Sequence, residues 1–279
     1  MYIAVFVCFA SKAVHLELVT NLSTDSFLLA FKSFIARRGV PHRVHSDNAT
    51  NFVGARNDLR SLQRALEDQQ SQFQLFVVEK GVEWRFIPPR APHFGGLWEA
   101  DVKSAKEILV RQVADASLTE AEVRAYLADT EAVLNSRPLT PTSTDPNEGE
   151  ALTPGHLLVG QALCSLPQGL EPDAPTRGLR FSKRWQLLST LRQRFWQAWS
   201  KEYVHSLQRK TKWQTTSPNL EVGALVIIHE DNTPPQRWIT GRVVSVVAGA
   251  DGKIRVAEIK TATGVFKRPI QKLAALPLY

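Results

Sequence analysis

The sequence predicts an α/β protein that continues into a basic helix and a small antiparallel β-barrel. Strand-like and helix-like patterns alternate through residues 1–137, as expected for a sheet covered by helices. Residues 179–216 keep a helical period and are rich in Lys and Arg. Residues 217–279 hold short apolar runs separated by turn residues, which is typical of a small all-β unit. Between these parts, residues 138–178 are rich in Pro, Gly, Thr and Asp and are predicted to form an extended linker.

The first elements are a hairpin and a helix. Residues 2–10 form an apolar run, which predicts a strand buried on both faces and places Cys8 in the core. Residues 14–19 alternate as the second strand of the hairpin. Ser23 or Thr24 is expected to cap a helix that Gly39 ends.

The next elements bring an acidic residue to the end of a strand. They are predicted as a strand at 43–46, a helix at 51–68, a strand at 82–87 and a helix at 119–134. Asp47 directly follows the strand at 43–46. In α/β sheets, ligands collect beyond the carboxyl ends of the strands, so Asp47 is a candidate site residue.

A Pro/Gly-rich loop ending at Gly96 precedes a further helix. Its predicted buried face consists of Trp98, Val102, Ala105, Leu109 and Val113. Glu99, Lys103 and Lys106 lie at i, i+4 and i+7 and share a neighbouring stripe. One carboxylate and two ammonium groups on one stripe suit the joint binding of a metal ion and a phosphate backbone. The alternative is an ordinary solvated face with an i,i+4 Glu–Lys pair.

The predicted linker is preceded by the sequence Asn-Ser-Arg-Pro at residues 135–138. This motif fits either a DNA contact or a helix that ends before proline.

Residues 177–212 form a strongly basic segment, with ten basic residues against one acidic residue, Glu202. The helical period runs through Leu188, Leu191, Phe195, Trp199, Tyr203 and Leu207. One interpretation is a helix that packs its aromatic residues inward while the basic face keeps it soluble. The other is a nucleic-acid surface, where charges follow phosphates and tryptophan rings stack or pack. On that interpretation the DNA contacts include Arg184, Arg192, Arg209, Lys210 and Lys212.

The last part of the chain contains four predicted strands, beginning near Val226, Gly241, Ile254 and Val265. Asp251-Gly252 is a strong hairpin-turn signal between two of them. This pattern predicts the small antiparallel barrel.

Composition limits the class of protein. With 43% hydrophobic and 22% charged residues the chain is expected to be globular. Its net charge of +7 favours an anionic partner, and nucleic acid before a membrane. Two cysteines form neither a disulfide framework nor a zinc site. No apolar run has the length of a membrane span, so an intracellular location, nuclear or cytoplasmic, is expected.

Several motifs, in order along nearly the whole chain, resemble the integrase of BEL/Pao-type LTR retrotransposons. The motifs are residues 45–54 (His-Ser-Asp-Asn-Ala-Thr-Asn-Phe-Val-Gly), 84–89 (Trp-Arg-Phe-Ile-Pro-Pro), 93–99 (His-Phe-Gly-Gly-Leu-Trp-Glu) and 134–139 (Leu-Asn-Ser-Arg-Pro-Leu). Residues 152–156, 195–199 and 249–256 look like the segment that follows the catalytic core in these polyproteins.

The resemblance implies a ribonuclease-H-like core that joins element DNA to a target. Such enzymes use three carboxylates and two Mg²⁺ or Mn²⁺ ions, which activate the attacking oxygen and neutralise the leaving oxygen. Asp47 matches the second carboxylate and Glu99 the third, so both are implied metal ligands. Asn48, Lys103 and Lys106 match positions that the family places near DNA.

The chain departs from the family pattern at its N-terminus. The family's first catalytic Asp lies on a strand that precedes residues 2–10, and this is the central strand of the family's sheet. The chain begins after it, so we expect an N-terminally truncated core that is inactive by itself. The N-terminal zinc-binding module usual in integrases is also absent.

Two functions from different classes remain open. One is an integrase-derived nucleic-acid-binding protein related to metal-dependent polynucleotidyl transferases. The other is a non-catalytic DNA- or chromatin-binding protein domesticated from a retroelement. In both cases DNA binding is expected to be largely independent of sequence and to weaken with salt, and the protein is a possible homo-oligomer.

Overall fold

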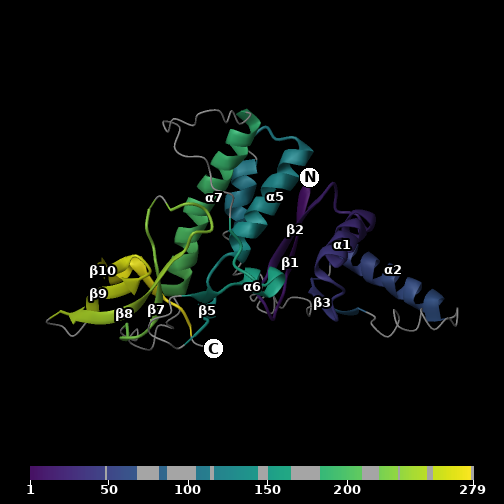
Figure 1. The fold of residues 1–279 in the computed structure, drawn as a ribbon. Coiled ribbons are helices and arrows are strands. Elements are labelled where there is room, and N and C mark those ends of the chain that lie inside the picture. Colours follow the sequence, from purple (N-terminus) through teal and green to yellow (C-terminus); the bar gives the residue numbers. More distant parts are fainter. Residues whose placement is uncertain are drawn as a thin grey trace. The chain divides into compact units, whose positions relative to one another are not determined.

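The computed structural model groups the chain into two compact units, made of residues 1–7 with 15–103 and residues 8–14 with 104–279. Each unit is described by itself below, with element labels as in Figure 1. The structure describes residues 1–47, 49–67, 82–86, 105–113, 116–143, 150–164, 183–208, 220–231, 233–249 and 254–277.

The first unit begins with the predicted hairpin and helix. Strands β1 (Tyr2–Val7) and β2 (Val14–Val19) form a two-stranded sheet. Helix α1 (Thr24–Arg38) begins at Ser23, whose side chain accepts a hydrogen bond from the Ser26 N–H. It ends at Gly39, which has a φ of 85° and donates its N–H to the Ile35 carbonyl. The predicted cap and stop of this helix are therefore confirmed.

A second pair of strands in this unit is parallel. Strand β3 (Arg43–Ser46) pairs with β4 (Glu83–Phe86), and helix α2 (Thr50–Glu67) follows β3. The described strands thus form two separate two-stranded sheets, β1-β2 and β3-β4. Both contribute to one aromatic core, since Phe6 of β1, Val44 of β3 and Trp84 of β4 pack with Phe27 and Phe31 of α1. A continuous ribonuclease-H-like sheet stays a prediction.

Strand β1 differs from its prediction. Each of its residues is at least partly exposed, with Tyr2 at 48% and Val5 at 38%. The prediction of burial on both faces is therefore wrong for this strand. Cys8, which follows β1, is likewise exposed and not part of the core.

The second unit is built around two long helices. Residues 105–113 are helical, with Ala105 and Leu109 buried as predicted. Helix α5 (Glu120–Asn135) begins with a capping box between Thr119 and Glu122 and packs against α7 (Lys183–Gln208).

The predicted linker at residues 138–178 contains short elements. Strands β5 (Thr140–Pro141) and β6 (Ala151–Leu152) pair, and α6 (Pro154–Val159) follows them. Thr153 caps α6 through a second capping box, here with His156. The prediction of an extended linker is thus wrong for these residues, because a cap and a proline at the first helical position start a helix there.

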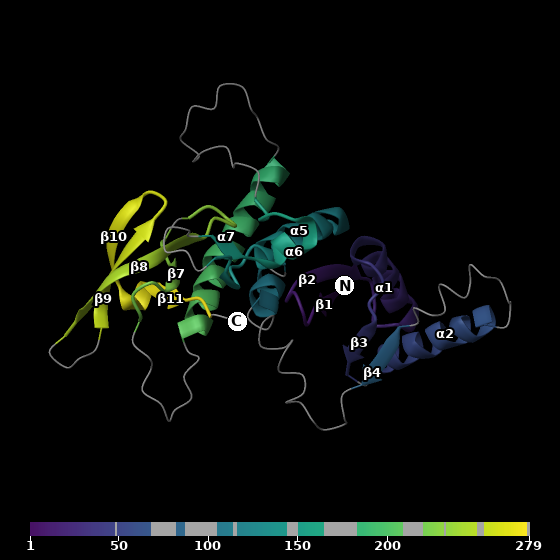
Figure 2. The same cartoon turned by 60° about the horizontal axis from the view of Figure 1, so that its bottom comes forward.

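An antiparallel sheet of five strands ends the second unit (Figure 2). Its order is β10-β9-β8-β7-β11, and β11 was not predicted. The strands are β7 (Leu225–Ile228), β8 (Ile239–Ala248), β9 (Ile254–Thr261), β10 (Gly264–Pro269) and β11 (Leu273–Ala275), with a 3-10 helix η2 (Ile270–Lys272) before the last.

The sheet is buried on both faces where it meets α7. Val226 and Ile228 of β7 belong to one apolar cluster together with Val243 and Ile259. The alternate residues of β7 and β11 belong to a second cluster with Val204 of α7. This sheet and α7 therefore share a core, whereas closure into a barrel stays a prediction.

Candidate nucleic-acid interface

Asp47 lies where the sequence predicted, directly after β3 and before α2. Its side chain is exposed, and one carboxylate oxygen accepts the Ala49 N–H at 3.0 Å. The Ser46 hydroxyl holds this corner, because it donates to the Asp47 carbonyl and accepts the Trp84 indole N–H, both at 2.9 Å. Asp47 therefore has a local structural role at the start of α2 while remaining open to solvent.

The residues expected to complete the carboxylate site lie outside the described part of the chain. These are Asn48, Glu99 and Lys103. Lys106 is described and is exposed on the helical stretch 105–113. Within the described residues no group of three or more His, Cys, Asp or Glu side chains is placed to hold a metal ion.

Helix α7 has an aromatic face that is fully packed. Phe195, Trp196 and Trp199 are at most 2% exposed. Trp196 and Trp199 also make edge-to-face contacts with Trp238, with ring centroids 4.7 and 6.0 Å apart. The interpretation that these two tryptophans stack on nucleic acid is therefore wrong, and their rings belong to the core. Trp185 is 49% exposed, and Trp213 lies outside the described residues.

The opposite face of α7 is cationic. Lys183, Arg194 and Lys201 are exposed, and they are separated by 11 and 7 residues. At about 100° per residue these spacings are close to three and two whole turns, so the three side chains share one stripe. Lys183 and Lys201 are about 27 Å apart along the axis at about 1.5 Å per residue. We call Lys183, Arg194 and Lys201 the α7 stripe.

The α7 stripe has no competing charge partner in the described part of the chain, where none of its residues forms an ion pair. His205 lies one turn beyond Lys201 and is exposed as well. Glu202 is the single acidic residue of α7. The sequence contained this signal, because at about 100° per residue the stripe lies across the helix from Trp199. Lys183, Arg194 and Lys201 were nevertheless not among the predicted contacts.

Arg184, a predicted DNA contact, is paired within the chain. Its guanidinium binds both carboxylate oxygens of Glu122 and donates to the Ser117 carbonyl at 3.0 Å. The hydrogen bonds from Arg184, together with those from Thr119, lower the pKa of Glu122 from its usual value of 4.5 to about 2. Half of the Arg184 side chain is still exposed, so its charge is shared between Glu122 and solvent.

Arg192, another predicted DNA contact, faces α5. Only 12% of its side chain is exposed, and its guanidinium lies 3.5 Å from the Asp129 carboxylate. Its Nε is buried without a hydrogen-bond partner in the described part of the chain. Burial raises the pKa of Asp129, and the nearby Arg192 charge opposes that shift. The predicted contacts Arg209, Lys210 and Lys212 lie outside the described residues.

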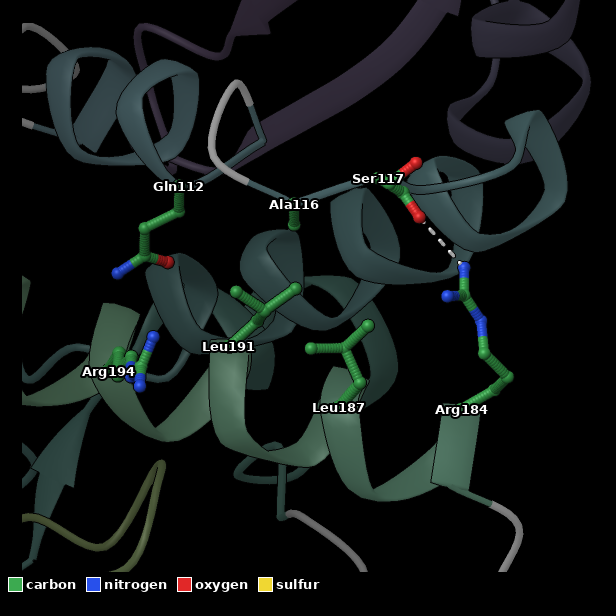
Figure 3. Close-up of a pocket in the computed structure, with 7 residues that line it drawn as sticks. All are labelled: Gln112, Ala116, Ser117, Arg184, Leu187, Leu191 and Arg194. Carbon is green, nitrogen blue, oxygen red and sulfur yellow. Dashed lines mark hydrogen bonds between the residues drawn. The ribbon is translucent and has the colours of Figure 1, made fainter.

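A pocket of about 330 Å³ lies beside the α7 stripe (Figure 3). Leu187 and Leu191 of α7 form its apolar part, and Arg184 and Arg194 are among its polar lining residues. The other lining residues are Gln112, Ala116 and Ser117. Because Arg184 is already bonded to Ser117 and Glu122, Arg194 is the lining arginine available to an anion.

The Asn-Ser-Arg-Pro motif has structural partners. The Asn135 side-chain amide accepts the Val14 N–H at 2.8 Å and donates to the Val14 carbonyl at 2.7 Å. The Arg137 guanidinium donates to the Leu134 and Lys12 carbonyls at 2.7 and 2.5 Å. Both side chains are buried. The alternative of a DNA contact is therefore not supported for these two residues.

Comparison with known proteins gives limited additional information. Residues 183–276, which cover α7 and the five-stranded sheet, match DUF5641, a family of unknown function. No curated protein matches the chain. Among solved structures, the chain is similar to the cryo-EM structure of the simian T-cell lymphotropic virus intasome in complex with PP2A regulatory subunit B56 gamma, at 15% sequence identity and a TM-score of 0.38. The alignment covers 98% of this chain and 72% of that chain. In the described part of the chain, no helix is both long and apolar enough to cross a membrane.

Proposed function

We propose that this chain is a nucleic-acid-binding protein derived from the integrase of a BEL/Pao-type retrotransposon, and that it binds DNA through the α7 stripe. The observation that carries the proposal is the two-sided character of α7. One side is packed aromatic core, and the other presents Lys183, Arg194 and Lys201 to solvent. The integrase origin rests on the sequence motifs around Asp47 and Glu99.

The dimensions of the α7 stripe suit a phosphate backbone. Its length of about 27 Å corresponds to about eight successive phosphates of one B-DNA strand at about 3.4 Å each along the axis. The three cationic side chains of the α7 stripe contact phosphates, and phosphate contacts carry no information about base sequence. Binding is therefore largely independent of sequence and is driven by the release of counterions.

We propose further that Asp47 and Glu99 belong to a metal site. They match two of the three carboxylates of the family pattern, and they are the residues that would hold Mg²⁺ or Mn²⁺. Phosphodiester displacement by the two-ion route requires ligands for both ions.

The second candidate function is a non-catalytic DNA- or chromatin-binding protein domesticated from a retroelement. It is favoured by the shared core of α7 and the five-stranded sheet, which positions the α7 stripe without any contribution from Asp47. DNA binding is common to both functions. They differ in whether the carboxylates retain any metal-dependent activity.

The proposal is tested in two assays on the full chain. Fluorescence anisotropy with two duplexes of unrelated sequence should give similar dissociation constants, and both should rise steeply with salt. Isothermal titration with Mn²⁺ should show binding to the wild type that Asp47→Asn and Glu99→Gln each weaken. Absence of duplex binding would refute the proposed DNA interface. Mn²⁺ binding that neither substitution weakens would refute the proposed metal site.

A further inference from the structure

The pocket of Figure 3, which we call the α7 pocket, is lined along one side by a regular row of side chains. Arg184, Leu187, Leu191 and Arg194 occupy positions i, i+3, i+7 and i+10 of α7. Residues at these spacings share one face of a helix. The two leucines lie between the two arginines, which are about 15 Å apart along the axis at about 1.5 Å per residue. The α7 pocket therefore has an apolar middle and a guanidinium group at each end.

The opposite wall of the α7 pocket is held by backbone hydrogen bonds. Ala116 adds to its apolar lining. The Ala116 N–H donates to the Val113 carbonyl at 3.3 Å, and the Ala116 carbonyl accepts the Leu118 N–H at 2.8 Å. The Ser117 carbonyl accepts the Arg184 guanidinium at 3.0 Å. Because these contacts fix the wall without a ligand, little conformational entropy has to be lost when a ligand binds.

The polar groups of the α7 pocket differ in what they can offer a ligand. Arg184 binds both carboxylate oxygens of Glu122. The Gln112 side-chain amide is hydrogen-bonded to the hydroxyl of Tyr126, which is fully buried. Arg194 is exposed and forms no ion pair with any residue that the structure describes. An anion in this pocket is therefore directed to the Arg194 end.

The size and lining of the α7 pocket indicate the class of ligand. Its volume of about 330 Å³ lies at the lower end of the range of small-molecule sites, about 300 to 1,000 Å³. A planar guanidinium binds a carboxylate through two parallel hydrogen bonds. We propose that the α7 pocket binds a small organic carboxylate, with the anion on Arg194 and an apolar ring or chain on Leu187 and Leu191, and that its occupancy weakens DNA binding.

The effect on DNA rests on the proposed function, because Arg194 belongs to both the α7 pocket and the α7 stripe. A carboxylate bound to Arg194 neutralises one of the three charges of the stripe. The loss of one phosphate contact makes the slope of log K against log salt shallower by about 0.9. By linkage, bound DNA lowers the affinity for the carboxylate by the same factor as the carboxylate lowers the affinity for DNA.

Binding to the α7 pocket is tested on the full chain without DNA, by ligand-observed NMR with naphthoate and its neutral amide. Naphthoate should bind with a dissociation constant of about 1 mM, and the amide about tenfold more weakly. Arg194→Gln should raise the naphthoate dissociation constant about tenfold and remove the preference over the amide. Arg124→Gln, at an exposed arginine of α5 outside the pocket, should change neither. No naphthoate binding at about 10 mM, equal affinity for both compounds, or equal losses in the two variants would overturn the proposal.

The place of binding is tested by filling the α7 pocket without a change of charge. Ala116→Leu adds a larger side chain to the lining and should abolish naphthoate binding, whereas Ala125→Leu, at an exposed position of α5, should not. Circular dichroism verifies that both variants are folded. Full binding by Ala116→Leu would contradict the assigned site.

The link to DNA is tested by fluorescence anisotropy with a labelled duplex in the presence of saturating naphthoate. The salt slope of the wild type should become shallower by about 0.9, and that of Arg194→Gln should not change. An unchanged wild-type slope would overturn the link. A chain that binds naphthoate but no duplex would refute the proposed function and confirm the carboxylate site alone.

Discussion

Removal of the α7 stripe should change the salt dependence of DNA binding by a calculable amount. The triple variant Lys183→Gln, Arg194→Gln, Lys201→Gln keeps polar side chains of similar helix propensity but loses three charges. For B-DNA, log K falls with log salt with a slope of about −0.9 per neutralised phosphate, so the slope should become shallower by about 2.7. Over a fourfold rise in salt, from about 50 to about 200 mM, the wild type should lose about 40-fold more affinity than the variant.

Fluorescence anisotropy with a labelled duplex measures this slope directly, because the dissociation constant is obtained at each salt concentration. Arg124→Gln is a suitable control, since Arg124 is an exposed arginine on α5 that pairs with Glu120 and lies outside the α7 stripe. It should leave the slope unchanged. If the triple variant and the wild type had equal slopes, the reasoning that places phosphates along the α7 stripe would be refuted.

Three further predictions concern the contacts that hold the fold. Asn135→Ala leaves the N–H and carbonyl of Val14 without their partners and should lower the free energy of unfolding by about 2 to 3 kcal/mol in urea titrations; an unchanged midpoint would contradict this. The pKa of Glu122 is depressed from 4.5 to about 2, so the pair with Arg184 stabilises the folded state above pH 4.5, and that stability is lost as the pH falls toward about 2. Arg184→Ala should therefore flatten the pH dependence of urea unfolding in this range, and an equally steep profile would show that the pair contributes nothing. Gly241→Ala places a Cβ 2.5 Å from Ile259 Cγ2 and 2.7 Å from the Lys260 carbonyl, which should cost about 1 to 3 kcal/mol; a variant as stable as the wild type would show that β8 and β9 can separate without penalty.

Local signals predicted local structure well. Ser23 and Gly39 bound α1 as expected because a side-chain cap and a positive φ act within one turn of the chain. The start of α6 at Thr153 and Pro154 carried equally local signals, which the Pro- and Gly-rich composition around them concealed. Strand β11 had no such signal, since three residues after η2 become a strand only through pairing with β7.

The burial of side chains and the pairing of charged side chains were harder to predict. Both depend on contacts with residues that are distant in the sequence. The apolar run of β1 predicted burial on both faces, but each of its residues is at least partly exposed. In α7 the number of Lys and Arg residues correctly indicated a basic segment. It did not show which of these residues lie on the exposed side of the helix. Arg192 lies on the same side as Leu191 and Phe195 and is used against α5, whereas Arg194 and Lys201 remain in solvent.

The most direct test of the proposed DNA interface is a lysine footprint of the unmutated protein. Acetylation of surface lysines, quantified by mass spectrometry with and without a saturating duplex, reports which ammonium groups DNA covers. Lys183 and Lys201 should be protected, while Lys32, exposed on α1, should react equally in both samples. Equal labelling of Lys183 and Lys201 with and without duplex, at concentrations where anisotropy shows saturation, would contradict the proposal that α7 carries the DNA.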